Sequence, residues 1–279
     1  MNQLLHAGLS RSFKSTLVRA CFGVMLVTAL FAGGIVANTA QKTYVEVPAF
    51  VEDCMVAALP MLPFVCAVLV ALLLGSEYEQ GTIRNKLAAG HTRAAIYASS
   101  LAVCLVTTLA LLVVLLLVGV ALGWAVLGDW LLPPAQLALV VAACCLASAA
   151  LSTICVALTM NLSNRAVAVT VLLVLLYGMF IASGFFESAL HAAEFSYEYV
   201  VMTTEGIQYG PLAPNPEYAS GTKRAVYEFL YSLLPTSQIA KISNSEFESC
   251  SPLWLVLSLG VAVVTGTLGY LGFRSKDIK

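Results

Sequence analysis

The chain reads Ser76-Glu77-Tyr78-Glu79-Gln80-Gly81-Thr82-Ile83-Arg84-Asn85-Lys86-Leu87-Ala88-Ala89-Gly90-His91-Thr92-Arg93 between two long segments that carry no charge. We call this stretch the polar loop. It holds five charges in a protein that is 60% hydrophobic and 10% charged, whereas soluble domains average about 25% charged residues. Such a loop has to lie in water on one side of a bilayer. Its length suits a short helix, a break at Gly90 and the start of another helix.

Six apolar segments are long enough to cross a membrane, which takes roughly 20 residues for a helix. None of the six contains Asp, Glu, Lys or Arg, and none shows the short alternating pattern of a barrel strand. The sequence therefore predicts an all-α integral membrane protein with six transmembrane helices in one domain, residues 1–279. The segments are residues 20–39, 54–75, 95–127, 135–160, 166–186 and 253–273.

The third apolar segment is ambiguous, because 35 uncharged residues separate Arg93 from Asp129. That is more than one span needs and too few for two spans and a turn. We expect one tilted helix that extends beyond the bilayer on the polar-loop side. A kink or a re-entrant piece is the alternative.

Charge orients the six spans, which place both termini and the polar loop on the same side. That side carries ten basic and three acidic residues, a net +7, and the other side carries four basic and twelve acidic residues, a net −8. Basic residues accumulate in cytoplasmic loops, so both termini and a coupling loop over residues 76–94, which contains the polar loop, are expected in the cytoplasm.

The N-terminal residues precede a full-length apolar span, so the sequence favours a retained first helix over a cleaved signal peptide. Residues 3–17 have Leu5, Leu9, Phe13 and Leu17 at i, i+4 spacing. This pattern predicts a short amphipathic helix in the membrane interface. A frayed extension of the first span is the alternative.

Most cysteines fall inside spans, where a thiol packs as a small apolar group. Cys54 and Cys250 lie near the outer ends of the second and sixth spans. They are the candidates for a disulfide in an oxidising exterior.

The sequence contains no motif that indicates catalysis. The chain lacks the phosphate-binding loop of ATPases, and its three histidines stand alone without metal-ligand spacing. The spans contain no ionisable residue that could relay protons or ions. We expect no catalytic residue, no metal site, no directly bound cofactor and no nucleic-acid partner. Energy for transport would have to come from another chain.

The segment 187–251 lies outside the membrane in this topology and holds eight Glu and three basic residues besides many aromatics. Helical spacing predicts a helix over residues 222–234 that stops at Pro235. An acidic and aromatic surface suits a cationic amphipathic peptide, and Glu194, Glu198 and Glu205 are candidates for contacting it. A solvated cap over the outer mouth is the alternative.

The polar loop has an acidic residue, Gly81-Thr82, a short helical stretch, and a small-polar-Arg step into the third span. This order resembles the first cytoplasmic loop of ABC-2 type ABC-transporter permeases, and most closely the bacterial lantibiotic, bacteriocin and bacitracin export or immunity permeases. The resemblance implies a bacterial cytoplasmic membrane, peptide export or immunity, a separate cytoplasmic ATPase that binds ATP and Mg, and a second copy or a similar permease beside it. The residues it implicates in ATPase coupling are Glu77, Glu79, Gly81, Thr82, Arg84, Lys86, His91 and Arg93.

Within that loop, Glu77 and Glu79 are expected near a helix start, where they favour the dipole, and Gly90 is expected to stop the helix. The helix would lie along the membrane surface and expose Arg84 and Lys86. Two alternatives stay open. The loop charges could be ordinary solvated residues, and the protein could be a non-transporting scaffold or sensor that binds a ligand through its outer segment.

Overall fold

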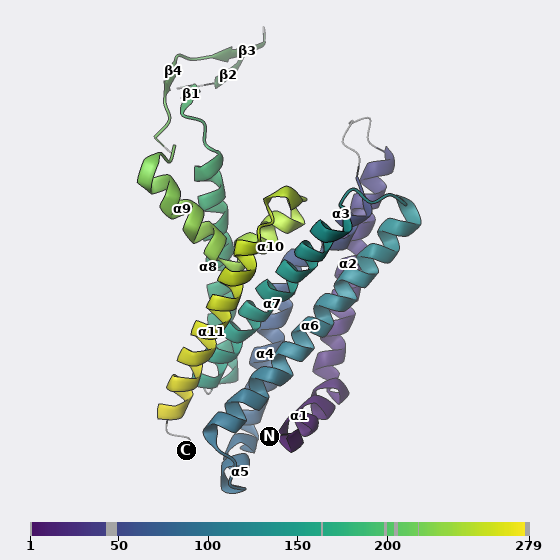
Figure 1. The fold of residues 1–279 in the computed structure, drawn as a ribbon, viewed down its shortest axis with the longest axis vertical. Helices are drawn as coiled ribbons and strands as arrows, with labels where there is room; N and C mark the ends of the chain where they lie inside the picture. The colour runs from purple at the N-terminus through teal and green to yellow at the C-terminus, as the bar shows by residue number, and fades with distance from the viewer. Residues whose placement is uncertain are drawn as a thin grey trace.

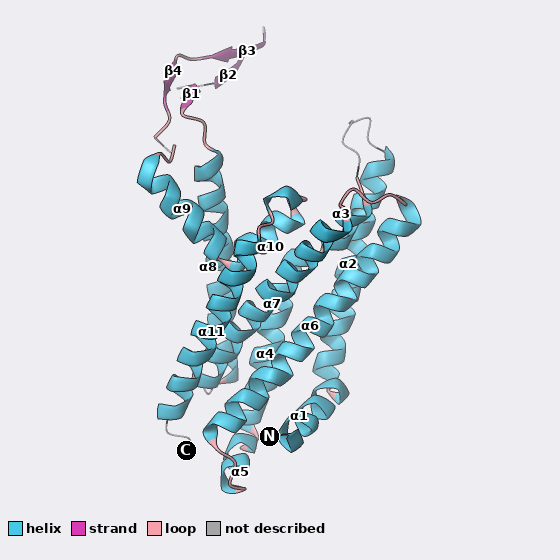
Figure 2. Cartoon of the chain, viewed as in Figure 1, coloured by secondary structure: helices cyan, strands magenta, loops and turns pink. Residues whose placement is uncertain are grey.

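The computed structural model describes residues 2–42, 49–162, 164–197, 200–203, 206–216 and 218–276. Six of its helical stretches are long and apolar enough to cross a membrane, which confirms the six predicted spans (Figures 1 and 2). The spanning helices are α2 (Thr16–Lys42), α3 with α4 (Val51–Val56 and Leu62–Glu79), α6 (Arg93–Val126), α7 (Pro134–Leu162), α8 (Arg165–His191) and α11 (Pro252–Ser275).

The long third segment folds as one unbroken helix, α6, of 34 residues. At 1.5 Å per residue it is about 51 Å long, well beyond the roughly 30 Å of the hydrocarbon layer. The single helix is therefore the correct interpretation, and a re-entrant piece is excluded.

The second span is divided instead of continuous. A 3-10 turn, η1 (Leu59–Met61), separates α3 from α4, and Pro60 and Pro63 lack the N–H groups that an unbroken helix would use there. The short piece α3 packs on α6 at Gly119 and Gly123. A Cβ atom on Gly119 would lie 2.5 Å from the carbonyl oxygen of Cys54. This spacing of two glycines, four residues apart, permits close helix contact.

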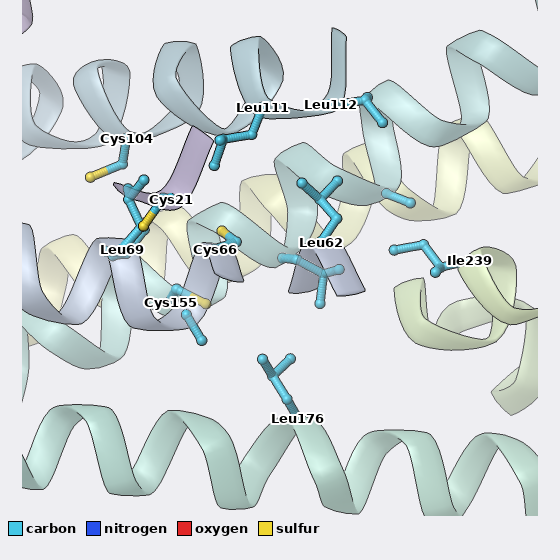
Figure 3. Close-up of a cluster of buried hydrophobic side chains, with 14 of the residues drawn as sticks. Cys21, Leu62, Cys66, Leu69, Cys104, Leu111, Leu112, Cys155, Leu176 and Ile239 are labelled. Atoms are coloured by element: carbon cyan, nitrogen blue, oxygen red, sulfur yellow. The ribbon is translucent and has the colours of Figure 1, made fainter. Parts of the chain in front are cut away.

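The core lies between the spans and consists mostly of aliphatic side chains and thiols, with a few aromatic residues and methionines (Figure 3). Cys66 and Thr108 are 3.3 Å apart, Sγ to Oγ1, and both are buried. Figure 3 shows Cys66 and Cys155 among the leucines of neighbouring helices. The intramembrane cysteines therefore pack as small core residues, as the sequence predicts.

The long segment after α8 forms two small antiparallel pairs of strands, β1 (Phe195–Tyr197) with β4 (Leu212–Pro214) and β2 (Val200–Thr203) with β3 (Gly206–Tyr209). These strands project from the end opposite the polar loop (Figure 1). Two helices, α9 (Gly221–Leu233) and α10 (Pro235–Ser243), and a 3-10 turn, η2 (Phe247–Ser249), lead to α11.

The helix predicted over residues 222–234 is confirmed as α9. As predicted, α9 stops just before Pro235, since it ends at Leu233 and Leu234 is extended. Pro235 then begins α10 in its first turn, where a missing N–H costs nothing. Helix α10 is buried and tied to its neighbours by hydroxyl and amide groups. Ser237 donates to Ser183 of α8 at 2.8 Å, and Ser258 of α11 donates to Gln238 at 2.8 Å. The segment between α8 and α11 is thus anchored inside the bundle through α10.

The two cysteines that were candidates for a disulfide, Cys54 and Cys250, have free thiols in the structure. Cys54 is buried and its thiol donates to the carbonyl oxygen of Gly33 in α2 at 3.5 Å. Cys250 is half-buried against the apolar core, and burial raises the pKa of its thiol to about 11. The sulfur of Cys54 therefore contacts α2, whereas that of Cys250 packs against the apolar core.

Candidate functional site

The polar loop lies at one end of the bundle with α1 (Asn2–Lys14), and we call this the polar-loop end (Figure 1). Its centre is α5 (Thr82–Ala88), a seven-residue helix. Gly81 joins α4 to α5 with a φ of 64°, a left-handed conformation that favours glycine. Ile83 is 1% exposed and anchors α5 to the bundle.

Helix α5 ends in a Schellman motif. The N–H of Gly90 donates to Leu87, and the N–H of His91 donates to Lys86 at 3.2 Å. Gly90 has a φ of 86°, as this motif requires. The predicted stop at Gly90 is therefore confirmed. Thr92 then caps α6, because its hydroxyl accepts from the N–H of Ala95.

Glu77 and Glu79 are not near a helix start, which corrects the expectation from the sequence. Helix α4 continues past the apolar run and ends at Glu79, so both carboxylates lie in its last turn. The negative end of a helix dipole disfavours anions. These two residues therefore need cations nearby, and other elements supply them.

Glu77 is the hub of the polar-loop end, with only 13% of its side chain exposed. The Nζ of Lys86 lies 2.8 Å from one carboxylate oxygen, and the Nη1 of Arg11 lies 3.8 Å from the other. Arg11 also donates to Gln80 at 2.5 Å. Lys86 is thus bound to Glu77 and does not form the exposed pair with Arg84 that the sequence suggested.

Helix α1 packs on this hub with its small residues. A Cβ on Gly8 would lie 2.8 Å from a methyl group of Val103 in α6, and Ser12 is buried. Of the predicted apolar stripe, Phe13 is exposed, whereas Leu5, Leu9 and Leu17 are half-buried. Between α1, α4, α5 and α6 lies a cavity of about 30 Å³ that Glu77, Lys86 and several serines line. That volume suits about one water molecule.

Glu79 pairs with Arg165, the first residue of α8, at 3.6 Å. Both side chains are about half-exposed, so the pair itself contributes little stability. The backbone contact beside it is tighter, since a Cβ on Gly75 would lie 2.8 Å from the Cβ of Arg165. Because Gly75 has no side chain, the start of α8 packs closely on α4 next to the polar loop.

Arg93 fastens the end of α11. Its Nη1 donates to the carbonyl oxygens of Phe273, Arg274 and Lys276 at 3.1, 2.9 and 2.5 Å. A guanidinium is favourable at the C-terminus of a helix, where carbonyl groups lack partners. The sequence places Arg93 in the coupling set, and the structure places it against the tail of the chain.

Lys276 continues this network at the end of α7. Its ammonium donates to the carbonyl oxygen of Met160 at 3.0 Å and lies 4.7 Å from the ring centre of Tyr78. The hydroxyl of Tyr78 donates to the same carbonyl. Burial lowers the pKa of the Lys276 ammonium. The ends of α4, α7 and α11 are therefore held together.

The face of α5 that remains open consists of Arg84, Asn85 and Ala88, followed by Ala89 and Gly90. Within the described part of the chain Arg84 forms no ion pair. Of the other predicted coupling residues, Gly81, Thr82 and His91 are partly exposed. The arrangement is a short helix with a fixed base and an exposed cationic tip.

The structure describes only one of the three glutamates that are candidates for contacting a peptide. Glu194 is exposed just before β1, whereas Glu198 and Glu205 lie outside the described residues. Sequence reasoning did not single out Glu52, yet it is fully buried and one of its oxygens accepts from the N–H groups of Leu131 and Leu132 at 2.8 and 2.6 Å. Its other oxygen has no partner among the described residues. Its position two residues before a predicted span, next to Asp53, was the available signal.

Six spanning helices and a charged helical loop at one end define a polytopic membrane protein with a polar contact surface outside the spans. Residues 13–181, more than half of the chain, match the family model described as ABC-2 family transporter protein. The chain therefore belongs to this family. It is a multi-pass permease component of a transporter and is not itself catalytic; the family in general works with a partner ATPase and as an oligomer. No protein of curated function matches the chain.

Proposed function

We propose that this chain is the membrane subunit of an ATP-binding-cassette transporter whose ATP and Mg are bound by a separate cytoplasmic ATPase that docks on α5. The observation that carries the proposal is the exposed tip of α5 on a base fixed by Ile83 and the Glu77–Lys86 pair. Family membership supports a transporter over a scaffold or sensor.

The connections of α5 suit the transmission of movement. A two-residue turn joins α5 to α4, Arg11 links the same site to α1, and Arg93 links the start of α6 to α11. A displacement of α5 would therefore act on four helices through short contacts. Coupling between distant sites is carried by such packed networks when they have two arrangements.

Arg84→Glu tests the docking surface. Arg84 is exposed, so the variant is expected to fold and reach the membrane normally while losing the ATPase subunit that co-purifies with the wild type. Lys86→Glu does not isolate docking, because it also removes the partner of Glu77. Arg274→Glu, an exposed charge at the same end of the bundle, is the matched control. Undiminished ATPase recovery with Arg84→Glu would contradict docking on α5.

The expected location is the bacterial cytoplasmic membrane with the polar-loop end in the cytoplasm, in accord with the excess of basic residues there. A pathway would form between two permeases, either two copies of this chain or this chain with a similar one. Exposed apolar side chains along α2, α8 and α11 leave surface for lipid and for a second permease.

For the substrate we propose a cationic amphipathic peptide that is exported or expelled from the membrane. The outer strands expose Phe195, Tyr197 and Leu212 next to Glu194, a combination suited to such a peptide. In cells, replacement of Glu194, Glu198 and Glu205 by Gln is expected to lower protection against a cationic peptide and leave protection against a neutral one unchanged. Equal protection by variant and wild type would favour a solvated cap.

A further inference from the structure

A second cavity at the polar-loop end is distinct from the docking face of α5. It has a volume of about 480 Å³ and its walls come from α1, the start of α2, the end of α4 and the start of α8. Three basic side chains line it, Arg11, Lys14 and Arg165, together with the hydroxyls of Ser15 and Ser76. The cavity is open to the surroundings of the bundle.

The cations around this cavity exceed the acids that neutralise them. Lys14 is exposed and forms no ion pair in the described part of the chain. Arg165 has Glu79 at 3.6 Å, and both of these side chains are about half-exposed, which leaves the pair well screened. Arg11 approaches one oxygen of Glu77 only to 3.8 Å, and Lys86 already neutralises that carboxylate from 2.8 Å at its other oxygen. The site therefore has capacity for an anion.

The remaining wall is apolar and consists of Leu17, Leu72 and Leu73. All three belong to spanning helices, so the wall continues toward the hydrocarbon region, whereas the basic groups lie where these helices begin or end. A site with cations at the interface and leucines below it matches the headgroup and upper acyl chain of a lipid. A soluble phosphate would leave the apolar wall unused.

We propose that this cavity binds the phosphate headgroup of an anionic phospholipid. Basic pockets between transmembrane helices at the cytoplasmic surface recognise such headgroups, and guanidinium groups bind phosphate through paired hydrogen bonds. Arg165 is set in place by the close contact of its Cβ with Gly75. A bound lipid would bridge α1 and α8 next to Glu77, and would stiffen the base of α5.

The test is lipid occupancy by native mass spectrometry, with protein in nanodiscs of phosphatidylcholine to which phosphatidylglycerol is added in steps. Wild type is expected to retain phosphatidylglycerol selectively. Lys14→Gln is expected to bind it about fivefold more weakly, the contribution of one basic residue near a membrane surface. Lys14→Gln with Arg165→Gln should bind more weakly still, and Lys14→Arg should bind as the wild type does. Arg274→Gln is the matched control.

The thermal unfolding midpoint provides a second measurement. Phosphatidylglycerol is expected to raise the midpoint of the wild type, because a ligand that binds only the folded state stabilises it, and Lys14→Gln should lose much of that gain while matching the wild type in pure phosphatidylcholine. Equal lipid retention by wild type and Lys14→Gln would overturn the assignment. So would an equal gain from inorganic phosphate in phosphatidylcholine, which would indicate a soluble anion site. Neither measurement depends on ATPase docking. The docking proposal can therefore be wrong while the lipid proposal holds.

Discussion

The carboxylate of Glu77 lies 2.8 Å from the ammonium of Lys86, and this pair joins the last turn of α4 to α5 across the polar loop. Both side chains are largely shielded, with 13% and 20% exposed. The pair offsets the unfavourable position of a carboxylate at the C-terminus of α4. It also fixes the angle between the two helices at the surface where a partner would dock.

Glu77→Gln and Lys86→Gln are each expected to lower the free energy of unfolding by about 1–2 kcal/mol, since a shielded charge loses its nearest partner while Arg11 remains. The double variant should be less destabilised than the sum of the two. The measurement is a double-mutant cycle from reversible unfolding in mixed micelles. Additive effects would show that the two residues do not interact in the folded protein.

Apolar runs were sufficient to predict the six spans, because span length is imposed by the bilayer rather than by neighbours. The break at Gly90 was predictable for a similar reason, since a left-handed residue after a short helix favours glycine. These features are local. Each depends only on one stretch of sequence and on whether that stretch lies in lipid or in water.

The partners of the charged residues could not be predicted in this way. Arg11 and Glu77 are 66 residues apart, and no periodicity relates them. The sequence analysis placed Glu77 at a helix start because the apolar run ends at Gly75, whereas α4 continues for one more turn. The sequence analysis did not single out Gly119 and Gly123, because only the fold shows that α3 packs against them.

Gly119→Ala is expected to destabilise the protein by about 1–3 kcal/mol, because the added methyl would lie 2.5 Å from the carbonyl oxygen of Cys54 and push α3 away. Gly178→Ala is the matched control: a Cβ added to Gly178 on α8 would have no neighbouring atom within 4 Å, so alanine should be neutral or mildly stabilising in that helix. Thermal unfolding in one detergent compares the two. Equal midpoints would contradict the close packing of α3 on α6.

Glu52→Ala is expected to cost about 2–4 kcal/mol, because the N–H groups of Leu131 and Leu132 would both lose their acceptor. Glu52→Gln keeps an amide oxygen in the accepting position and should cost much less. Unfolding in mixed micelles measures both. If glutamine proves as damaging as alanine, the negative charge of Glu52, rather than its hydrogen bonds, is what the fold requires.

Alkylation of Cys250 by a maleimide is expected to be slow at neutral pH and to rise about tenfold per pH unit toward 10. Only the thiolate reacts, and burial raises the pKa of this thiol to about 11. Lys241 favours the thiolate, so Lys241→Gln should slow the reaction further. Peptide mapping by mass spectrometry follows the site directly. The exposed control Ser188→Cys should react much faster at pH 7, and equal rates would contradict the shielding of Cys250.

Arg93→Gln is expected to release the end of α11, because three carbonyl groups lose the guanidinium that satisfies them. Hydrogen exchange at residues 273–276 should then speed up severalfold, as expected when about 1–2 kcal/mol of local stability is lost. Arg93→Lys should fall between the variant and the wild type, since an ammonium lacks the planar fork of arginine. Arg274→Gln, which removes an exposed side chain from the same turn, should leave exchange unchanged. If Arg93→Gln accelerates exchange no more than Arg274→Gln does, the tail is held by the burial of Phe273 and Arg93 is free to contact a partner.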